Sequence, residues 1–251
     1  GRGLGYAADD PRRAAGAALH LIGVASDRGH VFLPLTELIA QGDELQVPEA
    51  PLREAVEMLH ARGMLIVDVC DVYAPPLHRA ETDAARRLAM LVGPREPPKG
   101  VEQAIRAALS TPLSPDQARA VSESFEHGLL VITGGPGTGK TTCVRALVDA
   151  HTRLGRRVLL CAPTGRAAKR LSEATSTEAK TIHRLLEYSP HTGTFARGAD
   201  DPLEADLVLV DEASMIDLWL GDALLRAIPE RCALVLVGDV DQLPPVGAGP
   251  L

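Results

Sequence analysis

The fold is decided by the stretch Gly134-Gly135-Pro136-Gly137-Thr138-Gly139-Lys140-Thr141, which fits the pattern G-x-x-x-x-G-K-[ST]. It directly follows the apolar run Leu129–Thr133 and precedes a segment with helical periodicity, so it joins a strand to a helix. Small residues let successive backbone N–H groups point inward at anionic oxygens, and the following helix adds its positive N-terminal end. The stretch therefore predicts a phosphate-binding loop in an α/β domain.

The residues of this loop have distinct expected roles. Lys140 is expected to reach the β- and γ-phosphates of ATP as a catalytic cation, and the Thr141 hydroxyl is expected to bind Mg²⁺. The other residues expected to hold the nucleotide are Gly135, Pro136, Gly137, Thr138, Gly139 and Thr142. ATP and Mg²⁺ are thus the ligands that the loop predicts.

An acid pair, Asp211 and Glu212, follows the buried run that ends at Val210. A strand that ends in two acids presents them at the carboxyl edge of a parallel sheet, where ligands bind. Asp211 is expected to hold Mg²⁺ through water, and Glu212 to orient and deprotonate the attacking water. The alternative is that one acid only caps the next helix. After a further strand, Gln242 is expected to act as the catalytic sensor of the γ-phosphate.

Outward from the loop, short apolar runs alternate with helical patterns. The expected strands are Leu129–Thr133, Arg157–Cys161, Asp206–Val210 and Cys232–Val237. Nearly continuous apolar runs are typical of strands covered on both faces, and their alternation with helices predicts an α/β fold with a parallel sheet flanked by helices.

A Pro- and Gly-rich segment, 93–100, is the best candidate for a domain boundary. Before it we expect helices at Pro11–Val24, Leu35–Ala40 and Ala50–Arg62, then strands at Met64–Val69 and Val72–Ala74. This order predicts a small, mostly helical, winged-helix-like domain, which either touches DNA or braces the rest. The expected domains are 1–95, a linker and approach helix at 96–112, and the α/β domain at 113–251.

Composition and charge narrow the function. No apolar run approaches the roughly 20 residues of a membrane helix, so no membrane partner is expected. None of the four cysteines forms a Cys-x-x-Cys pair, which favours reduced thiols and a cytoplasmic setting. The net charge of the whole chain is −7. The segment from Lys140 to Asp200, however, contains eleven Lys and Arg and five Asp and Glu, which gives it a local charge of +6. That basic segment is compatible with a nucleic-acid backbone, or with a solvated helix surface.

Several segments together resemble the RecD-like group of superfamily 1 DNA helicases, which moves 5′ to 3′. They are Ser114–Gln117, Gly134–Thr142, Ala162–Ala168, Thr181–Leu186, Asp211–Met215 and Gly238–Gly247. The resemblance implies that residues 113–251 form the first RecA-like ATPase domain of a monomeric, ATP-dependent helicase of DNA repair or recombination. The implied partners are single-stranded DNA and junctions between single- and double-stranded DNA.

The same resemblance assigns further residues. It implies that Gln117 contacts the adenine edge, although Ser114 and Gln117 also fit a helix capping box. It implies that the DNA strand is met by Pro163, Thr164, Gly165, Arg166, Thr181 and His183. Hydroxyls, backbone amides and Arg can hold phosphates without reading sequence, which agrees with this assignment.

The segment at about 187–197 fits a β-hairpin with its turn near Gly193, and we expect it to be either a strand-separating pin or a surface loop. From the resemblance we expect that the family's second RecA-like domain, with its arginine fingers, is not part of this stretch of chain. The isolated chain is therefore expected to bind nucleotide but to hydrolyse it slowly. Two alternatives stay open: a P-loop NTPase switch or small-molecule kinase, and a non-catalytic DNA-binding module.

Overall fold

The computed structural model describes residues 7–108, 112–135, 137–239 and 247–249, which form two compact units. The first unit runs up to Asp83 and includes Asp217–Trp219 and residues 247–249; the second holds most of the remaining chain. In the described residues no helix is both long and apolar enough to cross a bilayer. The domain limits expected from the sequence stay predictions.

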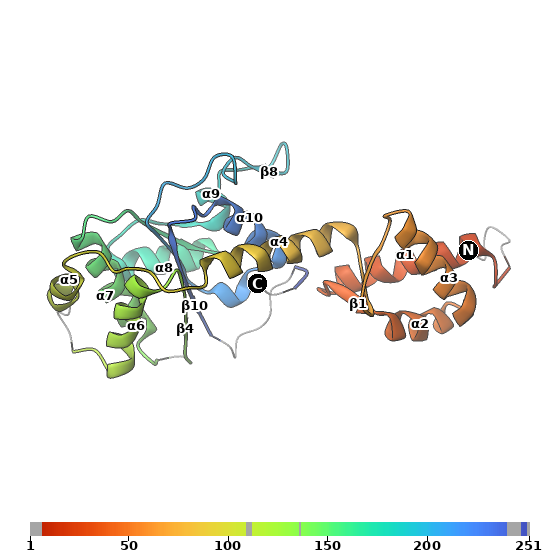
Figure 1. Cartoon of the computed structure of the whole chain (residues 1–251), viewed down its shortest axis with the longest axis horizontal. Coiled ribbons are helices and arrows are strands. Elements are labelled where there is room, and N and C mark those ends of the chain that lie inside the picture. Colours follow the sequence, from red (N-terminus) through yellow and green to blue (C-terminus); the bar gives the residue numbers. More distant parts are fainter. Residues whose placement is uncertain (1–6, 109–111, 136, 240–246, 250–251) are drawn as a thin grey trace. The chain divides into compact units, whose positions relative to one another are not determined.

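The first unit has the order helix, strand, helix, helix, strand, strand. Its elements are α1 (Pro11–Asp27), β1 (Phe32–Pro34), α2 (Leu35–Glu44), α3 (Glu49–Ala61), β2 (Ile66–Asp68) and β3 (Asp71–Tyr73). The strands form an antiparallel sheet in the order β1-β3-β2, and α1 packs on α3 (Figure 1). The side chain of Asp10 caps α1 by accepting a hydrogen bond from the Arg12 backbone N–H, which helps to fix where the helix begins. The three helices and the strands β2 and β3 are those that the sequence predicts, and β1 is a further strand that was not expected.

The core of this unit is aliphatic. Leu38, Leu52 and Val72 are fully buried, and they come from α2, α3 and β3. Apolar residues spaced three or four apart place one face of each helix against the small sheet. α4 (Pro75–Leu91) follows and runs on past Asp83 into the part of the chain that forms the second unit.

The second unit is built on a five-stranded parallel sheet in the order β4-β10-β9-β5-β6. The strands are β4 (Leu129–Thr133), β5 (Val158–Ala162), β6 (Ala179–Thr181), β9 (Leu207–Val210) and β10 (Ala233–Gly238). The predicted parallel α/β sheet is confirmed. The central strand β9 is buried at every residue, because neighbouring strands and helices cover both of its sides.

β4 differs from the expectation that each strand is covered on both faces. Among the described strands it lies at the edge of the sheet with β10 as its one neighbour, and Val131 is 57% exposed. The apolar run predicts the strand correctly, but an apolar run does not reveal whether the strand lies at the centre or at the edge of a sheet.

Helices connect the strands. They are α5 (Val101–Ala108), α6 (Pro115–Glu126), α7 (Lys140–Arg153), α8 (Gly165–Thr175), the short α9 (Ile182–Leu185), the 3₁₀ turn η2 (Ala213–Met215) and α10 (Leu218–Ala227). α7 contacts α5, α6 and α8, and Figure 1 shows α6 and α7 close to β4 and β10. Leu147 of α7, Phe125 of α6 and Val235 of β10 share one buried cluster, so the helix after the phosphate-binding loop is anchored in the core.

Candidate nucleotide site

The glycine-rich loop lies between β4 and α7, as the sequence predicts, and its backbone needs glycine at two positions. Gly137 and Gly139 have φ values of 79° and 84°, a left-handed region that costs other residues about 1–2 kcal/mol. A Cβ on Gly139 would also collide with the Gln117 side-chain nitrogen. Gly139 is the N-cap of α7, so the loop delivers the chain to a helix N-terminus suited to an anion. Pro136 lies outside the described residues.

The ammonium group of Lys140 is held at the mouth of this loop. It donates hydrogen bonds to the backbone oxygens of Gly134 and Gly135, the latter at 3.2 Å, and lies 3.9 Å from a carboxylate oxygen of Asp239. Asp239 is only 5% exposed and follows β10 directly. A phosphate bound in the loop would compete with these oxygens for the ammonium protons.

The acid pair lies at the end of β9. Glu212 has a φ of 53°, and its backbone N–H donates to Asp211 Oδ1 at 2.9 Å. The pKa of Asp211 is raised because its carboxyl group is buried, and the Glu212 backbone hydrogen bond and the charge of Lys140 offset only part of that rise. Lys140 and Asp211 thus lie on opposite sides of the space between the loop and β9.

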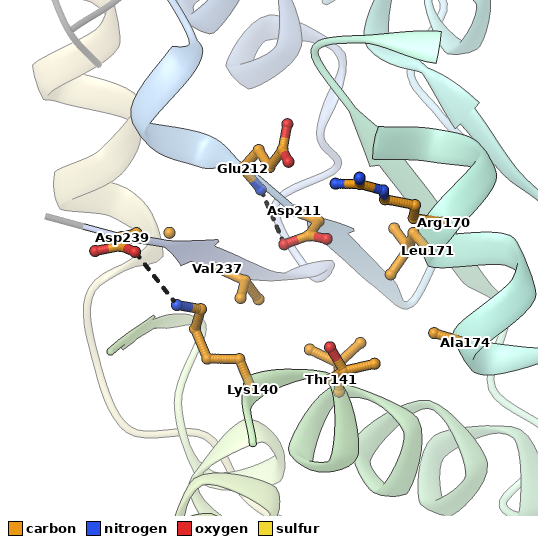
Figure 2. Close-up of a pocket in the computed structure, with 11 residues that line it drawn as sticks. Lys140, Thr141, Arg170, Leu171, Ala174, Asp211, Glu212, Val237 and Asp239 are labelled. Carbon is orange, nitrogen blue, oxygen red and sulfur yellow. Dashed lines mark hydrogen bonds and ion pairs between the residues drawn. The ribbon is translucent and has the colours of Figure 1, made fainter. Parts of the chain in front are cut away.

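That space is a cavity of about 270 Å³. It brings together two of the residues expected from the phosphate-binding loop, Lys140 and Thr141, and both acids, Asp211 and Glu212 (Figure 2). The other lining residues are Val144, Arg170, Leu171, Ala174, Val237, Gly238 and Asp239. A lysine of the phosphate-binding loop that faces two carboxylates across a cavity is the arrangement that a magnesium nucleotide requires.

The donor set suits Mg²⁺. The Thr141 hydroxyl and the Asp211 carboxylate are hard oxygen ligands that line the same cavity. Mg²⁺ in such sites takes one or two protein oxygens and completes its shell with phosphate oxygens and water. In the described residues no group of three or more His, Cys, Asp or Glu side chains could hold a metal by itself, so phosphate oxygens would be needed.

Gln117 joins the start of α6 to the loop. Its side-chain oxygen accepts a hydrogen bond from the Ser114 backbone N–H at 3.0 Å, while Ser114 Oγ accepts from the Gln117 backbone N–H, completing the capping box. The Gln117 amide nitrogen donates to the backbone oxygens of Thr138 and Gly139 at 3.3 Å each. The adenine contact implied by resemblance would have to share this amide, whose oxygen has a second lone pair.

The family of the chain follows from its similarity to known proteins. Residues 117–248 match the family described as AAA domain, which is more than half of the chain. The chain belongs to the AAA domain family. The ATP-dependent RecD2 DNA helicase of Deinococcus radiodurans is 38% identical over 263 residues, with 98% of this chain and 36% of that protein covered.

Two further relatives point the same way. The RecBCD enzyme subunit RecD of Mycobacterium tuberculosis is 34% identical over 261 residues, covering 94% of this chain and 43% of the relative. The ATP-dependent DNA helicase dda of phage T4 is 34% identical over 137 residues, covering 52% and 31%. The predicted resemblance to RecD-like superfamily 1 helicases is confirmed, and the chain spans well under half the length of these relatives.

The AAA domain places the residues expected to meet DNA at the ends of two adjacent parallel strands. β5 and β6 pair with Ala162 opposite Thr181, so the chain leaves both strands at the same edge of the sheet. Thr164 caps α8 by accepting from the Ala167 N–H, and Thr181 caps α9 by accepting from the Arg184 N–H. The neighbouring candidates Pro163, Gly165, Arg166 and His183 are at least partly exposed.

His183 also contacts a hairpin of the AAA domain. β7 (Tyr188–Ser189) pairs antiparallel with β8 (Thr194–Phe195), and Gly193 between them has a φ of 68°. The His183 ring lies 5.4 Å from the Tyr188 ring and 5.7 Å from the Phe195 ring, measured between centroids. The hairpin is thus packed against the segment that contains the candidate DNA contacts.

Sequence reasoning missed two charged residues of the AAA domain cavity, Asp239 and Arg170. Asp239 could have been found by the argument used for Asp211, because both follow directly on a strand of the parallel sheet. Arg170 lies within a helix and carried no comparable signal. Gln242 lies outside the described residues, and Thr142 is half-buried next to Thr141 without lining the cavity.

Proposed function

We propose that this chain is the nucleotide-binding part of an ATP-dependent DNA helicase that moves 5′ to 3′ on single-stranded DNA. The observation that supports it most is that Lys140, Thr141, Asp211 and Glu212 line one cavity. A phosphate-binding loop facing an acid pair is suited to cleaving the terminal phosphate of a nucleotide. The relatives called DNA helicases support the choice of DNA as the second ligand.

In this proposal the loop holds ATP by its polyphosphate. The backbone N–H groups around Gly137 and Gly139 and the N-terminus of α7 bind phosphate oxygens, and Lys140 exchanges its carbonyl partners for the β- and γ-phosphates. Thr141 and Asp211 hold Mg²⁺, which would offset phosphate charge when bound. Gln117 keeps the loop joined to α6, and its amide oxygen has a free lone pair for the adenine edge.

Hydrolysis needs a base beside the terminal phosphate. Glu212 takes a proton from a water molecule whose oxygen bonds to the γ-phosphorus, and the bond from that phosphorus to the bridging oxygen of ADP breaks. The products are ADP and inorganic phosphate. Both acids line the cavity, and Asp211 in addition accepts a hydrogen bond from the Glu212 backbone N–H. We propose that Gln242 senses the γ-phosphate.

DNA is held beside the sheet edge where β5 and β6 end. The hydroxyls of Thr164 and Thr181 accept backbone hydrogen bonds as helix caps, and each still has its own proton to donate to a phosphate oxygen. Arg166 supplies charge, and Pro163, Gly165 and His183 complete the proposed contact. Such contacts bind the backbone without reading bases, as a translocating enzyme requires.

The hairpin Tyr188–Phe195 is proposed to separate the strands of a duplex. Its aromatic residues contact each other and His183, with the Tyr188 and Phe195 rings 5.0 Å apart. Arg197 forms ion pairs with Glu187 at 3.0 Å and with Asp201 at 3.2 Å, which ties down the base of the hairpin. A braced hairpin next to the strand-binding segment is suited to splitting base pairs.

The test is unwinding by the complete protein on duplexes with either a 5′ or a 3′ single-stranded tail. Only the 5′-tailed duplex should be unwound, with ATP hydrolysis stimulated by single-stranded DNA. Lys140→Ala should abolish both activities, whereas Lys169→Ala, which removes a surface cation paired with Glu173, should retain them. ATP hydrolysis that ignores DNA would favour the switch or kinase alternative, and DNA-dependent function that survives Lys140→Ala would favour a non-catalytic module.

A further inference from the structure

Arg170 is a cation of the nucleotide cavity that the proposed mechanism leaves without a role. It lies on α8, and its guanidinium extends into the cavity toward Asp211 and Glu212 (Figure 2). In the described part of the chain its side chain makes no hydrogen bond and no ion pair. An exposed arginine that lines a cavity and has no partner within the described protein is available to bind a ligand.

The arrangement of α8 explains why this side chain faces the cavity. Ala167, Ala168 and Leu171 are buried and fix the rotation of the helix against the sheet. Arg170 and Ala174 are one turn apart on the face that lines the cavity, and the small Ala174 leaves room beside the guanidinium. The orientation of Arg170 is therefore set by buried packing.

The adjacent cation on the same helix behaves differently. Lys169 lies 3.9 Å from Glu173 as an exposed i,i+4 pair, and it does not line the cavity. Both residues are exposed cations of one helix, so a general effect of positive charge on a polyanion would affect both. A specific contact would affect only Arg170, and Lys169 is therefore a matched control.

The other charges of the cavity indicate which ligand group Arg170 would meet. Lys140 lies across the cavity at the phosphate-binding loop, and Asp211 and Glu212 lie between the two cations (Figure 2). A polyphosphate that starts in the loop and extends toward the acid pair places its last phosphate nearest to Arg170. The guanidinium has a planar set of donors that can grip two oxygens of one phosphate.

We propose that Arg170 binds the terminal phosphate of ATP, supplied by the same domain that carries the phosphate-binding loop. This inference rests on the proposed function, because it assigns a residue to the same ATP site. Arg170 then distinguishes ATP from ADP, since ADP has no phosphate within its reach. It also places a positive charge beside the phosphorus that water attacks, where negative charge must be stabilised during transfer.

The experiment measures equilibrium affinity of the complete protein for ADP and for a non-hydrolysable ATP analogue, both with Mg²⁺, by displacement of a fluorescent nucleotide. Arg170→Ala should lower the affinity for the ATP analogue by about tenfold to hundredfold, which is the range for losing a charged hydrogen bond. The affinity for ADP should stay within about twofold of the wild-type value. Arg170→Lys should fall between, because it keeps the charge but loses the paired donors. Lys169→Ala should match the wild type for both nucleotides.

Each other result overturns the inference. Arg170→Ala could lower the affinities for ADP and for the analogue equally, or lower neither. Either result would show that Arg170 does not hold the terminal phosphate. If Lys169→Ala lowered the affinity for the analogue by a comparable factor, the effect would come from the positive charge of the helix in general and not from a contact of Arg170. Absence of nucleotide binding in the wild-type protein would defeat the proposed function as well, whereas an unchanged ratio of the two affinities in a protein that binds ATP defeats only the role of Arg170.

Discussion

Acid should loosen α7, the helix after the phosphate-binding loop, through a single buried histidine. His151 is fully buried on α7 and stacks on Phe125 at a centroid distance of 3.8 Å. Ser124 Oγ donates to the Val121 backbone oxygen, so it accepts the proton of His151 Nε2 at 2.9 Å. Nδ1 is then the unprotonated nitrogen, and it is buried with no hydrogen-bond partner in the described structure.

These surroundings hold His151 neutral. Burial, and secondarily the nearby charge of Arg156, lower the pKa of His151 from 6.5 to about 3. The unfolded chain therefore binds one more proton than the folded chain between these two values, so the free energy of unfolding falls as pH drops below 6.5 and stops falling near 3. The slope approaches about 1.4 kcal/mol per pH unit, which gives about 2 kcal/mol lost by pH 5.

The assay is hydrogen exchange of the α7 backbone amides between pH 7.5 and 5, corrected for the intrinsic exchange rate. It reports the free energy of opening of this helix, so unfolding elsewhere in the chain does not obscure it. His151→Leu should remove this pH dependence while keeping the helix buried, and His20→Gln, an exposed histidine of α1, should retain the wild-type slope. If the wild type and His151→Leu lost stability in parallel down to pH 5, the burial argument would be wrong.

Further predictions concern the nucleotide site and the hairpin. Gly139→Ala should destabilise the second unit by about 1–3 kcal/mol in thermal melts and weaken nucleotide binding, because it combines left-handed strain with a contact on Gln117. Gln117→Ala should cost about 1 kcal/mol through the lost capping box, and a reduced preference for ATP over GTP would reveal the adenine contact. Glu212→Gln should bind ATP with near wild-type affinity but lower kcat by about 100-fold or more, as single-turnover kinetics would show. Replacing Tyr188–Phe195 with a short Gly-Ser linker should abolish unwinding and spare DNA-stimulated ATP hydrolysis, and loss of both would count against the pin.

The sheet could be predicted because its signal is local. Four of the five strands are short apolar runs, and β4, β5, β9 and β10 begin and end within about one residue of the predicted limits. The edge strand β6 has the sequence Ala-Lys-Thr, which is not an apolar run, and it was not predicted. The position of the phosphate-binding loop follows directly from the strand before it and the helix after it. The exposure of β4 could not be predicted, because strand order depends on pairings between residues about a hundred positions apart, such as Leu234 with Leu129.

Contacts made by side chains at the site were less predictable for a different reason. A motif names the residue type that a ligand needs, but it does not say what that residue does within the protein. Lys140 bonds to carbonyl oxygens of its own loop, and Gln117 uses its amide to join two segments. These interactions depend on the path of the backbone, which brings residues 21 and 22 positions apart into contact.

The orientation of Arg170 could not be predicted from the sequence, because it depends on how α8 packs. On charge alone it belongs with the basic helix surface, and it is adjacent in sequence to Lys169, which does pair on that surface. Only the burial of Leu171 and its neighbours settles which of the two cations turns toward the acids at the end of β9. If Arg170 binds the terminal phosphate, ATP contacts α8, the same helix whose N-cap residue, Thr164, is a proposed DNA contact. Single-stranded DNA should then raise the affinity for the ATP analogue more than that for ADP, and Arg170→Ala should remove the difference, because coupling between two ligands requires a group that both of them affect.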